Sequence, residues 1–169
     1  MIGVYVSIGS NVDRETNVRA AVAALRAEFG KLLVSTVYAT RAVGFEGEDF
    51  YNLVVGFHTD LPVHAVLERL RRIEADRGRK RGGSGFGPRT LDIDLLLYGD
   101  LVLHEESVTL PRKEITRYAF VLGPLAEIAG EVRHPGTGER IDDMWSNFEA
   151  DDQVLTPIPF VWQEGAATF

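Results

Sequence analysis

The eight residues LDIDLLLY, Leu91 to Tyr98, decide the predicted fold. This apolar stretch is too short and too closely bounded to be a long helix, so it is predicted to be a β-strand. Side chains two residues apart on a strand share a face, and we therefore expect Asp92 and Asp94 to stand side by side. The opposite, apolar face is expected to carry Leu91, Ile93, Leu95 and Leu97.

Upstream of this strand, the first predicted elements are a strand and a helix. Ile2 to Ile8 alternates and is rich in β-branched residues, which favours a strand that ends at Gly9. The helix that follows takes Asn11 or Asp13 as its N-cap and stops at Gly30. Its apolar residues recur at helical spacing, namely Val18, Val22, Leu25 and Phe29.

Two strands and a second helix are predicted next. The strands are Leu32–Tyr38 and Phe50–Thr59, joined by an acidic loop that contains glycine. Asp60 is expected to cap the helix, with Pro62 in its first turn and its end before Gly78. The predicted apolar stripe of this helix consists of Val63, Val66, Leu67, Leu70 and Ile73.

The resulting order, β-α-β-β-α-β, is typical of the ferredoxin-like α+β fold, an antiparallel sheet with helices on one face. We expect residues 1–169 to form a single domain, with residues 130–169 as a less regular extension packed on or beside it. In that extension a turn is predicted from His134 to Gly138, and Pro157 and Pro159 disfavour regular structure.

Composition limits the possible functions. A chain of 169 residues with 45% hydrophobic content has enough apolar residues for one compact core. It contains no cysteine, which excludes disulfides and thiolate chemistry. Its net charge of −7 argues against binding nucleic acid or an anionic membrane surface. No targeting segment or bilayer-length apolar run occurs, so we expect a soluble, cytoplasmic protein.

A basic, glycine-rich segment precedes the two aspartates. Between Arg77 and Arg89 there are several cations and no acidic residue, an arrangement that favours an anionic ligand. Paired carboxylates suit Mg²⁺, which also binds phosphate oxygens, so the combination points to a polyphosphate substrate. Solvated acids on a sheet face and a flexible, solvated basic loop remain the alternatives. Neither a Walker loop nor a Rossmann fingerprint is present.

The segment Gly87-Pro88-Arg89-Thr90-Leu91-Asp92-Ile93-Asp94, continued by Leu95-Leu96-Leu97-Tyr98-Gly99, resembles the signature of the 6-hydroxymethyl-7,8-dihydropterin pyrophosphokinase family of folate biosynthesis. The resemblance extends from Ile2 to about Ala129. It implies a ferredoxin-like fold and the transfer of pyrophosphate from ATP to the pterin hydroxymethyl group, with release of AMP. The implied co-substrate and cofactor are ATP and two Mg²⁺ ions.

The resemblance also implies roles for individual residues. Asp92 and Asp94 would hold the metal ions, and Arg81 and Arg89 would act with them in catalysis. ATP would be contacted by Arg71, Glu74, Arg79, Arg81, Phe86, Arg112 and Arg117. The pterin would be bound by Thr40, Val43, Phe50, Asn52, Asp92 and Phe120. The residues from Gly82 to Gly87 would close over the site.

Several positions depart from the family pattern. Arg41 replaces a common proline, Phe86 a common tryptophan, and Arg71 a usual glutamine. Arg112 follows Pro111 where the family generally has histidine, and the usual arginine is displaced to Arg117. Because guanidinium groups pair well with phosphate oxygens, we expect Arg112 or Arg117 to compensate.

Two other functions remain compatible with the sequence. One is a divergent kinase or pyrophosphokinase of the same fold that acts on another small alcohol. The other is a non-catalytic module whose arginine loop contacts RNA, against which the acidic net charge counts. The expected partners are ATP and a pterin, with no nucleic acid and no membrane, and possible contacts with other folate-pathway enzymes. A monomer is expected.

Overall fold

The computed structural model describes residues 1–41, 49–77, 91–150 and 153–162. Its main sheet has the strand order β5-β1-β4-β3-β8, and β2 also pairs with β4. The strands are β1 (Ile2–Ser10), β2 (Leu33–Val34), β3 (Tyr38–Thr40), β4 (Phe50–Thr59), β5 (Asp92–Tyr98) and β8 (Thr156–Pro157), and every pairing among them is antiparallel. A separate small hairpin joins β6 (Leu103–His104) to β7 (Thr109–Leu110).

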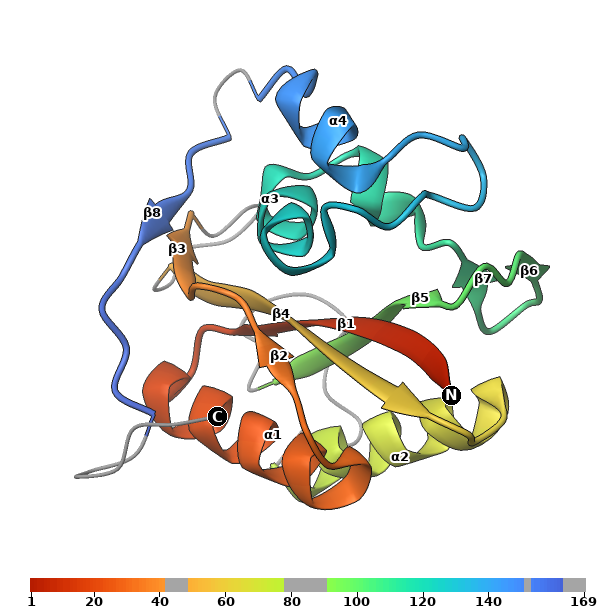
Figure 1. Cartoon of the computed structure of the whole chain (residues 1–169). Coiled ribbons are helices and arrows are strands. Elements are labelled where there is room, and N and C mark those ends of the chain that lie inside the picture. The colour runs from red at the N-terminus through yellow and green to blue at the C-terminus, as the bar shows by residue number, and fades with distance from the viewer. Residues whose placement is uncertain (42–48, 78–90, 151–152, 163–169) are drawn as a thin grey trace.

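Helices cover both faces of the main sheet (Figure 1). On one face lie α1 (Arg14–Phe29) and α2 (Val63–Asp76), and on the other α3 (Ala119–Ala129), which packs with the short α4 (Ile141–Ser146). A 3₁₀ turn, η1 (Lys113–Thr116), leads into α3. The prediction that the helices occupy one face is therefore correct for α1 and α2 and wrong for α3.

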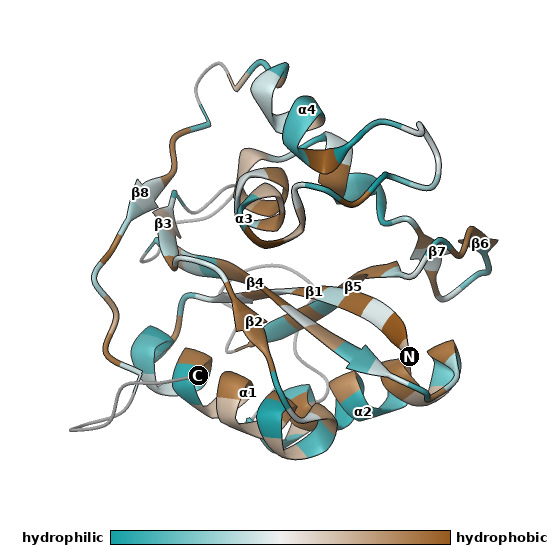
Figure 2. Ribbon diagram, viewed as in Figure 1, coloured by the Kyte–Doolittle hydropathy of each residue, from teal (hydrophilic) through white to brown (hydrophobic). Residues whose placement is uncertain are grey.

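The core has two parts, one on each side of the sheet. The larger part joins alternate residues of the strands to α1 and α2, including Ile8, Leu53 and Ile93. The smaller part lies under α3 and includes Val54, Leu96 and Leu125. Figure 2 shows apolar colouring along the central strands and hydrophilic outer turns on α1 and α2, as expected for helices that each cover a sheet with one face.

The predicted helices form with small changes at their starts. Asp13 is the N-cap of α1, in a left-handed conformation and with no side-chain capping bond, and Gly30 follows the helix with a φ of 84°. The second helix begins at Val63, with Pro62 itself as the N-cap, so the expectation that Asp60 caps it is wrong. Pro62 can take that place because its fixed φ suits the start of a helix and its carbonyl accepts the first bonds.

The predicted strand Leu32–Tyr38 is divided into β2 and β3. Ser35 causes the break, because its hydroxyl accepts a bond from the Val54 amide at 2.9 Å in the place of a backbone carbonyl. The expected absence of regular structure around Pro157 is also wrong, since β8 pairs with β3. Proline is tolerated there because β8 is an edge strand, where a missing amide donor costs little.

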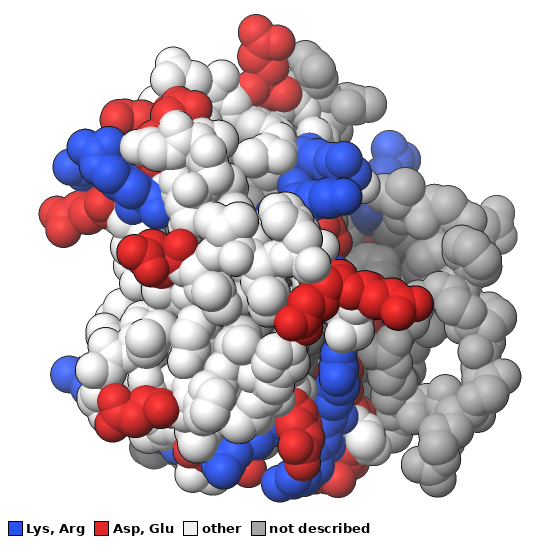
Figure 3. Space-filling view, turned by 90° about the vertical axis from the view of Figure 1, so that its right-hand side faces the viewer, with Lys and Arg blue, Asp and Glu red and all other residues white. Residues whose placement is uncertain are grey.

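Charged side chains of both signs lie on the surface of the molecule (Figure 3). On the face drawn in Figure 3, acidic and basic side chains surround a largely uncharged centre. In the described part of the chain, no helix combines the length and the apolar character that crossing a bilayer requires.

Candidate active site

The two aspartates lie on the face of the sheet that carries α3. On β5, Asp92 pairs with Gly9 and Asp94 with Ser7, while Ile93 between them points into the opposite core. Both carboxylates are partly exposed. The predicted pair of neighbouring acids is therefore confirmed in geometry, with Cα atoms separated by two strand rises, roughly 7 Å.

The apolar face of β5 differs from the prediction at Leu97. The register with β1 shifts between Tyr5 and Val6, which marks a β-bulge. Beyond the bulge, Leu97 joins the core under α3 rather than the core with Ile93 and Leu95. An inserted residue reverses the faces of the residues that follow it, which accounts for the change.

Glu74 supports the aspartates from behind the sheet. It is buried near the end of α2, and its Oε2 accepts a bond from the Ile93 amide at 2.7 Å. That amide lies between Asp92 and Asp94 in the chain. The carboxylate of Glu74 therefore holds the backbone of β5 in position at the residue between the two aspartates.

Gly9 lies between Asp92 on β5 and Asn52 on β4 and is paired with both. A Cβ at this position would lie 3.0 Å from Asn52 Oδ1 and 3.8 Å from Phe50 Cδ1. Glycine here thus leaves room beside the amide and the ring. Sequence reasoning assigned Gly9 no ligand role, although a glycine in a strand is a known signal of close approach.

Three of the predicted pterin residues are brought together at one end of β3 and β4. The side-chain amide of Asn52 donates a short hydrogen bond to Thr40 Oγ1, and both residues are buried. Phe50 pairs with Thr40 in the register between the strands. An amide, a hydroxyl and an aromatic ring at one edge can bind a flat heterocycle with a polar rim.

Phe120 lies in the first turn of α3, on the face of the sheet that also carries Asp92 and Asp94. Its ring stacks on Tyr118, with 5.0 Å between centroids and 28° between planes. The amide of Ala119, immediately before it, donates to Gln153 Oε1 at 2.8 Å. Gln153 was not identified from the sequence, because a contact across more than thirty residues leaves no local signal.

Arg112 lies beside the carboxylates, whereas Arg117 and Arg71 are exposed. The guanidinium Nη2 of Arg112 is 3.6 Å from Asp94 Oδ1 and 3.0 Å from Glu114 Oε2. Arg117 is bonded to Gln153 through its backbone carbonyl. Arg71 is on α2, on the opposite side of the sheet from Asp94. Of the three, Arg112 is the cation next to the paired acids.

Other predicted site residues lie outside the described residues. These are Val43, Arg79, Arg81, Phe86 and Arg89, together with the glycine segment Gly82–Gly87. Within the described ranges, no group of three or more histidine, aspartate or glutamate side chains is placed to hold a metal ion. A cation at Asp92 and Asp94 would therefore need further oxygen ligands from a substrate or from water.

Comparison with known proteins identifies the family. The sequence model of 7,8-dihydro-6-hydroxymethylpterin-pyrophosphokinase (HPPK) matches residues 5–130. A 2-amino-4-hydroxy-6-hydroxymethyldihydropteridine pyrophosphokinase of Bacillus subtilis is 37% identical over 159 residues, which cover 89% of this chain and 95% of the relative. The enzyme of the same name from Haemophilus influenzae is 34% identical and is covered completely, with 94% of this chain.

Solved structures support the same fold. A crystal structure of an HPPK-DHPS in complex with substrates matches 88% of this chain with a TM-score of 0.68, at 13% identity. The wild-type Plasmodium falciparum HPPK-DHPS gives a TM-score of 0.69 over 87% of this chain. This chain spans 45% and 44% of those two chains, respectively. From the family match and the identities to full-length relatives, the chain belongs to the 7,8-dihydro-6-hydroxymethylpterin-pyrophosphokinase family and is an ATP-dependent pyrophosphokinase of folate biosynthesis.

Proposed function

We propose that the α3-bearing face of the sheet is the site of pyrophosphate transfer, with Asp92 and Asp94 holding two Mg²⁺ ions. The observation that carries this proposal is the row Asp92–Gly9–Asn52 across three strands. It sets a carboxylate pair next to a polar edge suited to a pterin. Hard carboxylate oxygens fit Mg²⁺, which when bound stabilises negative charge on phosphate oxygens.

The reaction is a substitution at the β-phosphorus of ATP. The hydroxymethyl oxygen of the pterin forms a bond to that phosphorus, the bond from it to the bridging oxygen of AMP breaks, and the hydroxyl proton is released. The protein must hold the two substrates in line and stabilise phosphate charge, since phosphoryl transfer asks little covalent chemistry of it. In our proposal Arg112, 3.6 Å from Asp94, contributes a guanidinium to the phosphate region.

The basic segment supplies the remaining phosphate contacts in this proposal. Arg81 and Arg89 act on the transferring group, and Arg79 and Phe86 assist ATP binding. We keep Arg71, Glu74 and Arg117 as ATP-binding candidates. Glu74 has a second role whatever its contact with ATP, because it holds the Ile93 amide.

The pterin is proposed to lie between Phe50 and Phe120. Its polar edge would meet Asn52 and Thr40, with Val43 nearby. The amide of Asn52 offers both a donor and an acceptor to a pyrimidinone-like edge. Apolar burial of the rings on both faces would supply most of the affinity.

At the level of the whole chain we infer a ferredoxin-like arrangement. The strand order β5-β1-β4-β3, with β1 central and antiparallel to both neighbours, supports it. We further propose one domain over residues 1–169 with an extension from 130, a monomeric state and a cytoplasmic location. A physical contact with other folate-pathway enzymes remains a proposal.

Product analysis tests the proposed reaction. The protein is incubated with Mg-ATP labelled at the β-phosphorus and with 6-hydroxymethyl-7,8-dihydropterin. We expect unlabelled AMP and a pterin diphosphate that carries the label, formed in equal amounts and only when metal is present. Formation of labelled ADP and a pterin monophosphate would contradict the proposal, as would AMP formation at the same rate without the pterin.

A further inference from the structure

The first turn of α3 is capped by a residue from the C-terminal extension. Tyr118, the N-cap residue, makes no side-chain capping bond. The amide of Ala119 would then be one of the unsatisfied donors that begin every helix. Gln153 satisfies it, accepting from Ala119 at 2.8 Å and donating through Nε2 to the Arg117 carbonyl at 3.2 Å. One side chain therefore fixes both ends of the Arg117–Ala119 segment, and Phe120 is the next residue.

The chain after Gln153 continues along α3. Gly123 is buried, and a Cβ there would lie 2.8 Å from Leu155 Cδ1 and 3.1 Å from the Trp145 ring. Leu155 thus fills the space that the glycine leaves, one helical turn beyond Phe120. The extension contacts α3 at two successive turns on the side that bears Phe120.

The same segment then pairs with β3, a strand of the proposed pterin site. Thr156 pairs with Ala39 and Pro157 with Tyr38 in β3, and the amide of Ile158 donates to the Val37 carbonyl at 3.0 Å. Thr40, which accepts the Asn52 bond, is the last residue of β3. Figure 1 shows the segment passing from α4 beside β3 toward α1.

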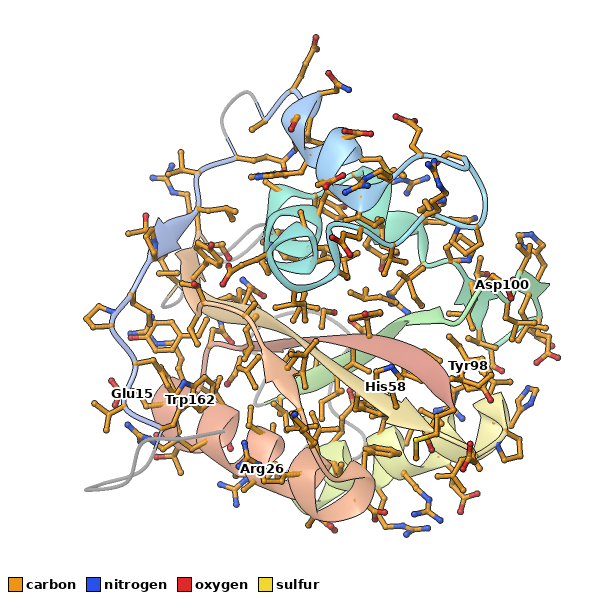
Figure 4. All side chains as sticks on the ribbon, in the orientation of Figure 1. Glu15, Arg26, His58, Tyr98, Asp100 and Trp162 are labelled. Carbon is orange, nitrogen blue, oxygen red and sulfur yellow. The ribbon has the colours of Figure 1, made fainter. Side chains whose placement is uncertain are left out.

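The end of the described segment is anchored on α1 and β4. Arg19 donates through Nε to the Val161 carbonyl, and its guanidinium lies 5.2 Å from the centroid of the Phe160 ring. Phe160 meets Tyr51 of β4 edge-on at 6.3 Å and contacts Trp162 at 4.5 Å between centroids. Figure 4 shows Trp162 beside α1. Residues 153–162 are therefore attached at both ends.

We propose that Gln153 is a positioning residue for the pterin site. Residues 153–162 connect the first turn of α3, which bears Phe120, to β3, whose last residue, Thr40, accepts the hydrogen bond from Asn52. Through this connection Gln153 sets the distance between Phe120 and the Thr40–Asn52 pair. That distance determines the width of the space between Phe50 and Phe120, the slot in which a flat heterocycle would lie. This inference rests on the proposed placement of the pterin between Phe50 and Phe120. It assigns a function to a residue beyond residues 5–130, the range that the family model matches.

Kinetics with each substrate varied separately test the assignment. Gln153→Met keeps the side-chain length and removes both bonds, whereas Gln153→Glu keeps the acceptor for the Ala119 amide. Because a helix N-cap acceptor is worth roughly a three- to tenfold change in an equilibrium constant, we expect Gln153→Met to raise KM for the pterin about three- to tenfold. KM for ATP should change less than about twofold. Gln153→Glu loses only the bond to the Arg117 carbonyl and should raise the pterin KM less than Gln153→Met does.

Two further variants distinguish a wrong role for Gln153 from a wrong placement of the pterin. Asn147→Ala removes an exposed amide from the same extension and should leave both KM values unchanged. Phe120→Ala should raise KM for the pterin if the proposed site is correct. A raised pterin KM in Phe120→Ala with no selective change in Gln153→Met would overturn the role of Gln153 alone. An unchanged pterin KM in Phe120→Ala would overturn the proposed slot, and this inference with it.

Discussion

Gly9 separates two chemically different neighbours, the Asp92 carboxylate on β5 and the Asn52 amide on β4. A side chain on Gly9 would point at Asn52 Oδ1, because a Cβ there would stand only 3.0 Å away. The residue therefore matters through the space it leaves. A glycine within a strand is a general sequence signal of close approach, but the two neighbours of Gly9 are identified only by the register of the three strands.

Gly9→Ala should impair pterin binding. The added methyl group must displace the Asn52 amide or the Phe50 ring, and overpacking of this kind costs about 1–3 kcal/mol. We expect KM for the pterin to rise roughly fivefold or more. Gly3→Ala on the same strand is the matched control, since its nearest new contact is 3.9 Å away. Equal effects of the two substitutions on the pterin KM would rule out a specific role for Gly9.

Arg112 and Arg117 differ in their surroundings, which sharpens the expectation that one of them replaces the missing histidine. Arg112 contacts Asp94 and Glu114, whereas Arg117 is exposed. Loss of a phosphate-stabilising donor costs about 2–4 kcal/mol, or roughly 10²- to 10³-fold in rate. Arg112→Ala should therefore lower kcat/KM for ATP by roughly 10²- to 10³-fold. The double variant, Arg112→Ala with Arg117→Ala, should show little further loss. Arg72→Ala, an exposed cation of α2, serves as control. A double variant within about threefold of the parent would show that neither arginine compensates.

The strand β5 is fixed by neighbouring elements close to its two aspartates, Asp92 and Asp94. Glu74 from α2 bonds the Ile93 amide on one face, and the bulge opposite Tyr5 and Val6 turns Leu97 toward α3. The strand was predictable from its short apolar pattern. The common face of Asp92 and Asp94 was predictable because side chains alternate between the two faces of a strand. The bulge was not, because it depends on the register with β1.

Glu74→Ala should destabilise the fold. It leaves the buried Ile93 amide without the Glu74 carboxylate that accepts its hydrogen bond, and an unsatisfied buried donor costs about 1–3 kcal/mol. Glu74→Gln keeps a carbonyl acceptor and should lose less. Urea denaturation of both variants measures the difference, with Glu68→Ala on the exposed side of α2 as control. Equal stability of Glu74→Ala and Glu68→Ala would contradict a structural role for this carboxylate.

The long helices and strands follow their periodic patterns closely, while the short elements do not. For α2 the predicted stripe is confirmed, with Val66, Leu70 and Ile73 buried. By contrast, α3 is apolar around much of its surface and contains Pro124, so it shows no amphipathic period. The edge strand β8 exists only because β3 offers its backbone. These two elements, α3 and β8, were not predicted from the sequence. In the proposed pterin site, α3 carries Phe120, and β8 pairs with β3, the strand of Thr40.

The extension beyond residue 130 packs on α3 and β3, next to the proposed pterin site. Its turn at His134 is predictable, and the structure shows how the turn is fixed. His134 Nδ1 accepts bonds from the Gly136 and Thr137 amides at 3.0 and 3.1 Å. Burial lowers the pKa of His134, an effect that the negative charge of Glu139 partly opposes.

This lowered pKa predicts a loss of stability in mild acid. The contribution of His134 is fully present above the unfolded pKa of about 6.5 and is lost as the pH falls toward the folded pKa. We expect the free energy of unfolding of the parent to fall below pH 6.5. His134→Asn, which does not titrate, should lose less over the same interval. Parallel stability curves for the two proteins would show that His134 does not contribute.

Metal-dependent release of AMP by the parent, Asp92→Asn and Asp94→Asn tests whether the two aspartates hold the metal ions. Each substitution keeps the side-chain size and removes one charged oxygen ligand, and a metal ion contributes several kcal/mol to the transition state. Single-turnover rates are measured over a series of Mg²⁺ concentrations, with unfolding transitions as the control for folding. We predict that both variants fold and that both are slower by at least about a hundredfold. Parent-like rates with an unchanged Mg²⁺ dependence in either variant would contradict the assignment of the two aspartates.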